Sequence, residues 1–137
     1  MEYHYNYNDI IVVNIQPNGE IQWTSRIPKR QETINDGGYY SSYAMAIVRD
    51  KICFVYNENP KNFGARKNNR RYGFNGSRSV LALTEVGMDG SISTFLLADN
   101  KKEGIITRPK VCKQIGKRAM AVFGEKGKRF KFGGLEL

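Results

Sequence analysis

The alternation of apolar and polar positions predicts a four-stranded antiparallel sheet in the middle of the chain, between residues 42 and 97. Four strand-like runs follow one another there, at residues 42–48, 52–56, 79–86 and 91–97. Residues 49–51 join the first two runs as a hairpin, and a turn ending in Asp89-Gly90 joins the last two. We therefore expect two hairpins, with a basic loop of residues 57–77 between them.

A further hairpin is predicted near the N-terminus, where a proline-asparagine-glycine turn at residues 17–19 separates two strands. The first strand, residues 10–15, is apolar at nearly every position, which predicts burial on both faces. The second strand, residues 20–27, alternates between apolar and polar side chains. We expect a single core patch that contains Ile15, Ile21 and Trp23.

The chain contains an internal repeat of about seventy residues, because the N-terminal hairpin aligns with residues 79–97. The C-terminal stretch, with strands expected at 109–115, 119–123 and 129–132, aligns with the first part of the central unit. The chain is thus expected to be one all-β domain or propeller portion of 137 residues. Its units are a partial one (1–31), a full four-stranded one (40–98) and a partial one (105–137).

No stretch has a helical period, so the predicted fold class is all-β, with antiparallel four-stranded sheets like the blades of a β-propeller. Residues 9–29, with an apolar strand, an Asn-Gly turn and Trp23, resemble the tryptophan-containing blade hairpins of β-propeller repeat proteins of Bacteroidetes. The C-terminal residues 128–137 are similar to the closing strand of propeller-like proteins of that group. The resemblance implies an extracytoplasmic propeller fragment and assigns no functional residue.

Positive charge is concentrated in the second half of the chain. Residues 61–137 contain seventeen Lys or Arg against six Asp or Glu, whereas residues 1–60 contain five against seven. One interpretation is that these cations keep exposed sheet edges from pairing with other chains. The other is that the second half binds a polyanion.

The loop of residues 57–77 is the candidate binding segment, because cations and aromatic side chains alternate in it. Cations for phosphates and aromatic rings for bases are the combination that single-stranded nucleic acid requires. An acidic glycan or a partner protein fits the same composition, and a solvated loop without a ligand is a further alternative. The candidate ligand-binding residues are Lys61, Arg66, Lys67, Arg70, Arg71, Tyr72 and Phe74.

The sequence contains no motif for catalysis, a cofactor or a metal. Cys53 and Cys112 lack Cys or His companions at metal-binding spacing, and the chain has one His, so buried free thiols are expected. There is no apolar run of about 18 residues, as a transmembrane helix would need. The first ten residues also lack the pattern of a signal peptide, which predicts either a cytoplasmic protein or a portion of a longer secreted chain.

The expected function is a non-enzymatic binding or scaffold module without a cofactor. A binder of anionic polymers, nucleic acid or acidic glycan, acting through the loop 57–77 is the alternative, and part of a propeller enzyme is the third. Because the units at both ends are incomplete, we expect the chain to self-associate or to belong to a longer chain.

Overall fold

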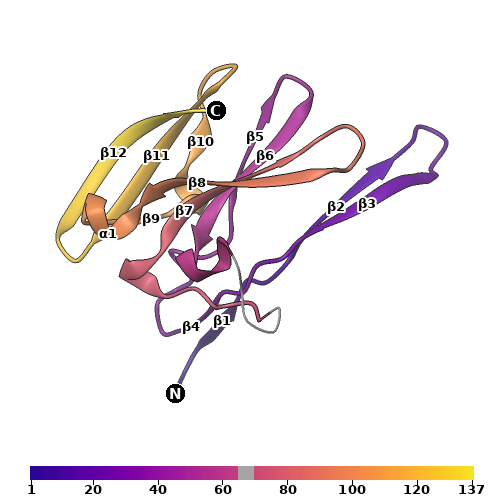
Figure 1. Cartoon of the computed structure of the whole chain (residues 1–137). Helices are drawn as coiled ribbons and strands as arrows, with labels where there is room; N and C mark the ends of the chain where they lie inside the picture. The colour runs from indigo at the N-terminus through magenta and orange to yellow at the C-terminus, as the bar shows by residue number, and fades with distance from the viewer. Residues whose placement is uncertain (65–69) are drawn as a thin grey trace.

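The computed structural model describes residues 1–64 and 70–137 (Figure 1). This part of the chain is mostly β and consists of antiparallel sheets, two of four strands and two of two strands, which confirms the all-β expectation. Its helical elements are single turns. They are η1 (Pro60–Asn62), η3 (Gly76–Arg78), α1 (Asn100–Glu103) and η4 (Pro109–Val111).

The central sheet contains the four strands that the sequence pattern predicts, antiparallel and in chain order. They are β5 (Ala44–Val48), β6 (Lys51–Glu58), β7 (Val80–Val86) and β8 (Ile92–Asp99). Both predicted hairpins are present, with Arg49 and Asp50 between β5 and β6 and residues 87–91 between β7 and β8. Gly90 has a φ of 83° in the second turn, a conformation that glycine adopts without steric strain.

The inner strands β6 and β7 are buried on both faces of the central sheet. Val55 and Leu83 belong to the apolar cluster on one face, whereas Phe54 and Ala82 belong to the cluster on the other. Because successive side chains of a strand point to opposite faces, both clusters need a covering layer.

The C-terminal sheet covers the first of these faces. Its strands are β9 (Ile106–Thr107), β10 (Lys113–Gln114), β11 (Ala119–Lys126) and β12 (Arg129–Glu136). β11 pairs with β12 along one edge and with β9 and β10 along the other, and Met120 is fully buried in the cluster that contains Val55. A Cβ atom on Gly124 would lie 2.3 Å from Ile105 Cδ1 and 3.0 Å from the main-chain oxygen of Ile106, so the close approach of β9 to β11 favours glycine there.

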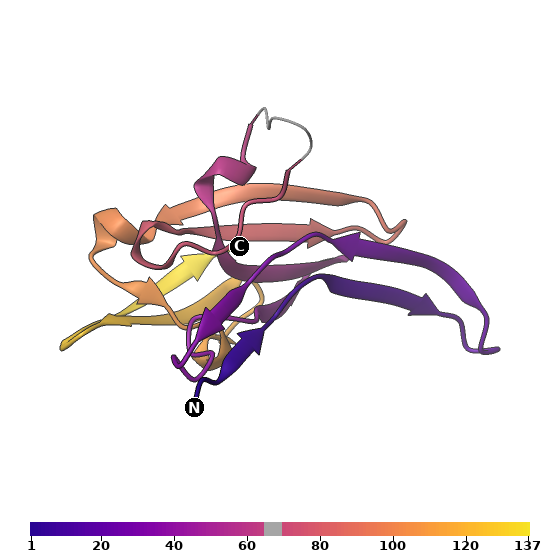
Figure 2. The same cartoon turned by 90° about the horizontal axis from the view of Figure 1, so that it is seen from below.

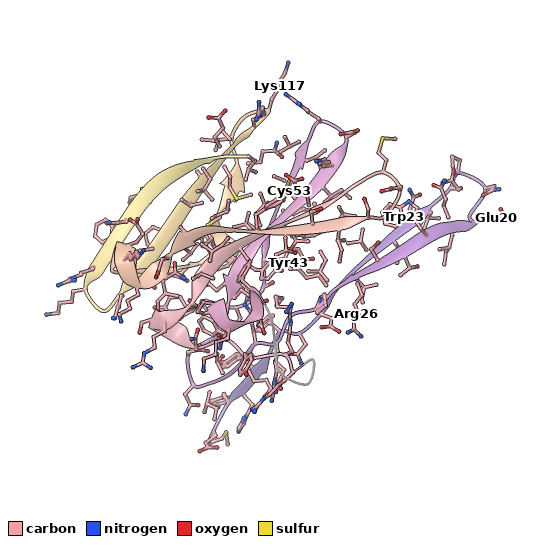
Figure 3. All side chains as sticks on the ribbon, in the orientation of Figure 1. Glu20, Trp23, Arg26, Tyr43, Cys53 and Lys117 are labelled. Atoms are coloured by element: carbon pink, nitrogen blue, oxygen red, sulfur yellow. The ribbon has the colours of Figure 1, made fainter. Side chains whose placement is uncertain are left out.

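The arm is the hairpin of β2 (Ile10–Ile15) and β3 (Ile21–Ile27), which projects from the body of the molecule (Figures 1 and 2). At its base, Ile10 and Ile27 pack in the cluster on the second face of the central sheet. Farther out, Trp23 Nε1 donates a hydrogen bond of 2.9 Å to Met88 O in the turn between β7 and β8 (Figure 3).

Two expectations for the arm are wrong. β2 alternates between covered and exposed positions, because no layer of the described chain lies over its outer face. Ile15 and Ile21 are 64% and 65% exposed and form no core patch with Trp23, which is partly buried. The pairing register shifts between Asn14 and Ile15, so Ile21 lies opposite Ile15 and leaves the face on which Trp23 packs.

A small N-terminal sheet pairs β1 (His4–Asn6) with β4 (Glu32–Ile34). The larger sheets are stacked as layers: the C-terminal sheet covers one face of the central sheet, and the base of the arm packs on the other (Figure 2). Propeller blades instead surround a common axis. The described residues therefore have antiparallel sheets of four strands, as expected, but no closed or propeller arrangement.

Asn57, near the end of β6, connects the segments that cross between the layers. Its side chain is fully buried, and its Nδ2 donates to Tyr40 O at 2.9 Å and to Thr107 O at 2.7 Å. Its Oδ1 accepts from Asn100 Nδ2 at 2.9 Å, and its main-chain oxygen accepts from Gln31 Nε2 at 3.0 Å. One amide side chain therefore satisfies two buried carbonyl groups of two crossing segments.

We expect Asn57→Ala to lower the free energy of unfolding by about 2–4 kcal/mol, because it leaves two buried carbonyls and the Asn100 amide without partners. Denaturant titration measures the change. Asn6→Ala, at an exposed position of β1, is the control, and it should alter stability by less than about 0.5 kcal/mol. A similar small effect of both substitutions would contradict the role given to Asn57.

Candidate functional site

Glu58 holds together the described ends of the loop 57–77. Its buried carboxylate accepts hydrogen bonds from Asn62 Nδ2 at 2.7 Å and from the next backbone N–H at 2.8 Å, and it lies 3.3 Å from Arg71 Nη2. Burial raises the pKa of the Glu58 carboxyl above its ordinary value, and the Arg71 guanidinium opposes that rise. Arg71 also donates to Pro28 O at 2.5 Å, so its charge is paired and supports the loop.

The structure brings three of the predicted site residues together. Lys61 Nζ lies 5.3 Å from the centre of the Tyr72 ring, and Arg70 Cζ lies 5.4 Å from it, within the range of cation–π attraction. Phe74 is partly buried and donates its backbone N–H to Arg30 O at 2.9 Å. The other two predicted residues, Arg66 and Lys67, lie outside the described part of the chain.

An open hollow of about 610 Å³ lies beside this cluster and has cations on two sides. Lys61 lines it from η1 and Arg78 lines it from η3, and Asn59 and Asn75 also line it. Two cations and two side-chain amides can hold an acidic group by ion pairing and hydrogen bonding. The loop therefore remains a candidate polyanion site, with Lys61, Arg70 and Arg78 as its cations and Arg71 as a structural residue.

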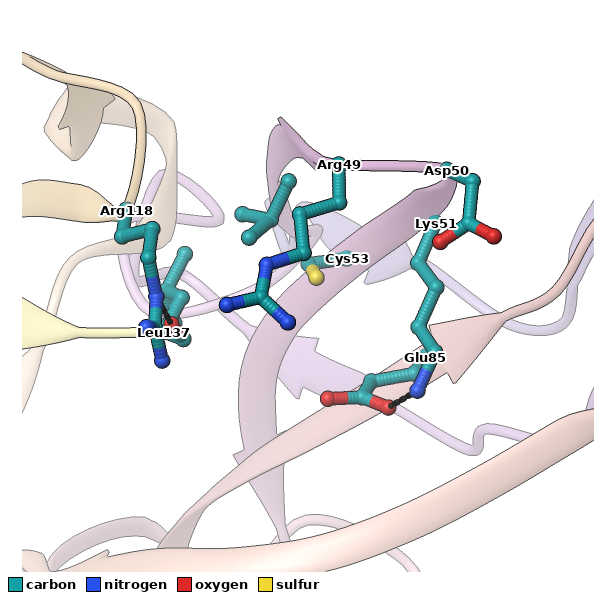
Figure 4. A pocket seen from close by; sticks show the side chains of 8 residues that line it. Arg49, Asp50, Lys51, Cys53, Glu85, Arg118 and Leu137 are labelled. Carbon is teal, nitrogen blue, oxygen red and sulfur yellow. Dashed lines mark hydrogen bonds and ion pairs between the residues drawn. The ribbon is translucent and has the colours of Figure 1, made fainter.

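A smaller hollow of about 170 Å³ lies between the β5–β6 turn and the β10–β11 turn, and Arg49 and Arg118 reach it from these two turns (Figure 4). Lys51 Nζ and Glu85 Oε2 form an ion pair of 2.8 Å at its wall. Cys53 also lines it, but burial raises the pKa of the thiol, which keeps the sulfur in its unreactive protonated form. The hollow therefore contains no activated nucleophile.

Lys29 is a buried cation at the base of the arm. Its Nζ donates to Gln31 Oε1 at 2.6 Å and to Tyr7 O at 2.5 Å, and the residue is 3% exposed. Burial lowers its pKa from 10.5 to about 8, although Glu58 and Asp9 oppose the shift. An amine with a lowered pKa can be a nucleophile, but this one is enclosed by its hydrogen-bond partners, which indicates a structural role.

A cluster of phenylalanines lies on the outward face of the C-terminal sheet, and we call it the aromatic face: Phe123, Phe130 and Phe132. The ring centres of Phe123 and Phe132 are 5.0 Å apart, and those of Phe130 and Phe132 are 5.9 Å apart with the rings nearly perpendicular. Phe130 is 63% and Phe132 is 76% exposed, although both lie in a regular strand.

The sequence pattern predicts a strand at residues 129–132 but does not mark this strand as a binding site. The available signal was the alternation Arg-Phe-Lys-Phe, which puts both phenylalanines on one face of a strand and both cations on the other. Whether the phenylalanine face was buried depended on which side of the sheet the core occupied. Met120 and Leu135 occupy the core side, so the phenylalanines face outward.

No family model, curated protein or solved structure matches the chain in the three comparisons. The resemblance to blade hairpins of β-propellers therefore stays a prediction. Cys53 and Cys112 are free and buried, as expected. Within residues 1–64 and 70–137, no group of His, Cys, Asp and Glu side chains is arranged to hold a metal ion, and no helix is long and apolar enough to cross a membrane.

Stability should rise between about pH 8 and pH 10.5 through Lys29, because its lowered pKa means that the unfolded chain binds more protons than the folded chain in this range. The gain amounts to about 3 kcal/mol at most. Unfolding of the wild type and of Lys29→Met as a function of pH measures it, because other titrating groups are common to both. Parallel curves would contradict the lowered pKa.

The loop hypothesis is tested with Lys61→Ala/Arg70→Ala. If these cations contact phosphates, the slope of log affinity for a single-stranded oligonucleotide against log salt should become shallower by about 1.4 for the two contacts, without a change in melting temperature. Arg71→Ala should instead destabilise the protein by about 3 kcal/mol, since it leaves the Glu58 carboxyl buried without its cation. Fluorescence anisotropy and thermal unfolding separate the two effects, and an unchanged slope would remove the loop as a site.

Proposed function

We propose that the protein is a non-enzymatic interaction module that assembles by pairing β8 with the β8 strand of a second copy. The observation that carries this proposal is the outer edge of β8. Residues 92–98 contain no charged residue and no proline, and the side chains of residues 92–96 are exposed. A long, uncharged and partly apolar edge is a template for an additional strand.

The outer edges of β5 and β12 are protected, which supports β8 as the pairing edge. At β5, Gln114 Oε1 accepts from Ile47 N at 2.9 Å, and Gln114 Nε2 donates to Ile47 O at 2.8 Å, so a side-chain amide takes the place of a neighbouring strand. At β12, charged side chains discourage pairing. These are Arg129, Lys131 and Glu136.

The side chains of β8 also support addition of a strand on this edge. Phe95 lies opposite Leu83 and Leu96 lies opposite Ala82, so the two side chains point to opposite faces of the central sheet. They are 48% and 50% exposed. A partner strand would extend both apolar clusters at once, and antiparallel pairing of two identical strands gives a closed two-fold dimer.

The more specific hypothesis, that the chain is a portion of a β-propeller, requires a different partner. Such a portion would leave unfinished surfaces that only the remainder of a longer parent chain covers. The β8 proposal requires a second copy and nothing else. A stable dimer of this chain alone would therefore favour the interaction module over the propeller portion.

We expect the wild-type chain to sediment as a dimer and Ser93→Lys/Phe95→Lys to sediment as a folded monomer, because the added charges repel across a β8–β8 pair. The matched control is Gln22→Lys/Thr24→Lys, which adds the same charge at the same spacing on exposed positions of the arm. Analytical ultracentrifugation with circular dichroism measures association and folding. A monomeric wild type, or dissociation by both variants, would overturn the proposal.

A further inference from the structure

We infer that the aromatic face, Phe123, Phe130 and Phe132 on the outward side of the C-terminal sheet, is a binding site for single-stranded nucleic acid. This site lies apart from the β8 edge, and it goes beyond the strand pairing proposed above. The inference rests on two features: rings that are open for stacking, and a basic segment that carries them.

The rings are accessible because their neighbours on the sheet are small. Phe123 and Phe132 lie directly opposite each other on β11 and β12, and the next pair on the same face is Ala121 with Gly134. A Cβ atom built on Gly134 would have no atom within 4 Å, so the surface beside the rings is open. Exposed aromatic rings on a sheet are the platform on which unpaired bases stack, whatever the base.

The C-terminal segment that carries the rings is basic, which suits a polyanion. Residues 105–137 contain nine Lys or Arg against two Glu. Of the two carboxylates, Glu125 is paired with Arg108 at 3.2 Å. Lys113 lies directly opposite Ala121 and therefore shares the face of the rings, and Lys128 lies in the turn between β11 and β12. Lys126 and Arg129 pair with each other at the strand ends beside this turn, on the face opposite the rings.

This density of charge favours nucleic acid over a protein as the occupant. The core of a protein–protein interface is depleted in charged residues, and lysine is depleted across such interfaces. Nucleic acid needs both components, because phosphates contact cations while bases stack on rings. A duplex keeps its bases paired and stacked inside, so its faces are closed to the phenylalanines, and the site should prefer single strands.

The aromatic face also differs from the predicted site in the loop. The Tyr72 ring already has Lys61 and Arg70 against it, which limits its use for stacking on a base. Among the described residues, no cation lies over the rings of Phe130 and Phe132. We therefore place base stacking on the C-terminal sheet.

The test is the affinity of Phe130→Ala/Phe132→Ala for a short labelled oligothymidylate, measured by fluorescence anisotropy at several salt concentrations. We expect binding at least about tenfold weaker than wild type, because each lost stacking contact costs about fivefold or more and the variant loses two. The salt slope should stay unchanged, since phenylalanine releases no counterions. Heparin, which has sulfates but no bases, should bind the variant as it binds the wild type.

Three controls define the outcome. Phe132→Tyr retains a stacking ring and should keep most of the affinity, whereas Ile11→Ala/Ile15→Ala removes exposed apolar surface from the arm and should have no effect. The variant Lys61→Ala/Arg70→Ala shows how much the loop contributes to the affinity for oligothymidylate. Undiminished binding by the phenylalanine variant, an equal loss of heparin binding, or no oligothymidylate binding by the wild type would overturn the inference. The variant should still dimerise, which separates this result from the test of β8.

Discussion

The structure depends on satisfying buried backbone carbonyl groups where the chain crosses between layers. A β ladder satisfies the backbone only within a sheet; β9 pairs with β11 at just two residues, and Tyr40 lies in a turn before β5. Asn57 supplies both donors of its amide to two of these segments, and the buried amides of Asn100 and Gln31 extend the network. This polar junction fixes how the central sheet, β9 and the linker before β5 meet, and the apolar clusters then fill the space on both sides.

The strands of the central sheet could be predicted from sequence because their apolar positions and turns agree with each other. The same reasoning failed on the arm. The apolar residues of β2 predict two covered faces, but whether a second layer covers the strand is a property of the whole fold. The register shift near Ile15 could not be predicted from the sequence either, because no glycine or proline marks its position in the strand. The layered stacking of the sheets also depends on tertiary contacts that a repeat pattern does not contain.

The candidate sites were predictable to different degrees. Composition identified the basic loop, and the structure brings Lys61, Arg70 and Tyr72 together there. It also gives Arg71 a partner, Glu58, whose burial the sequence did not reveal. The aromatic face could have been recognised as a row of phenylalanines, but its exposure depends on which side of β12 meets the core. Charge and aromatic content can thus suggest a binding segment, whereas tertiary packing decides which of its side chains are free.

Gln114 has a mechanical consequence for the two four-stranded sheets. Its amide binds both the N–H and the C=O of Ile47, so β5 of one sheet is fastened to β10 of the other at a single residue. Apolar clusters resist separation of two layers but resist sliding weakly, because such contacts are not directional. A pair of directional hydrogen bonds at the rim acts instead as a pin against shear. The C-terminal sheet, with its row of phenylalanines, is therefore held at a fixed angle to the central sheet when a force acts along it.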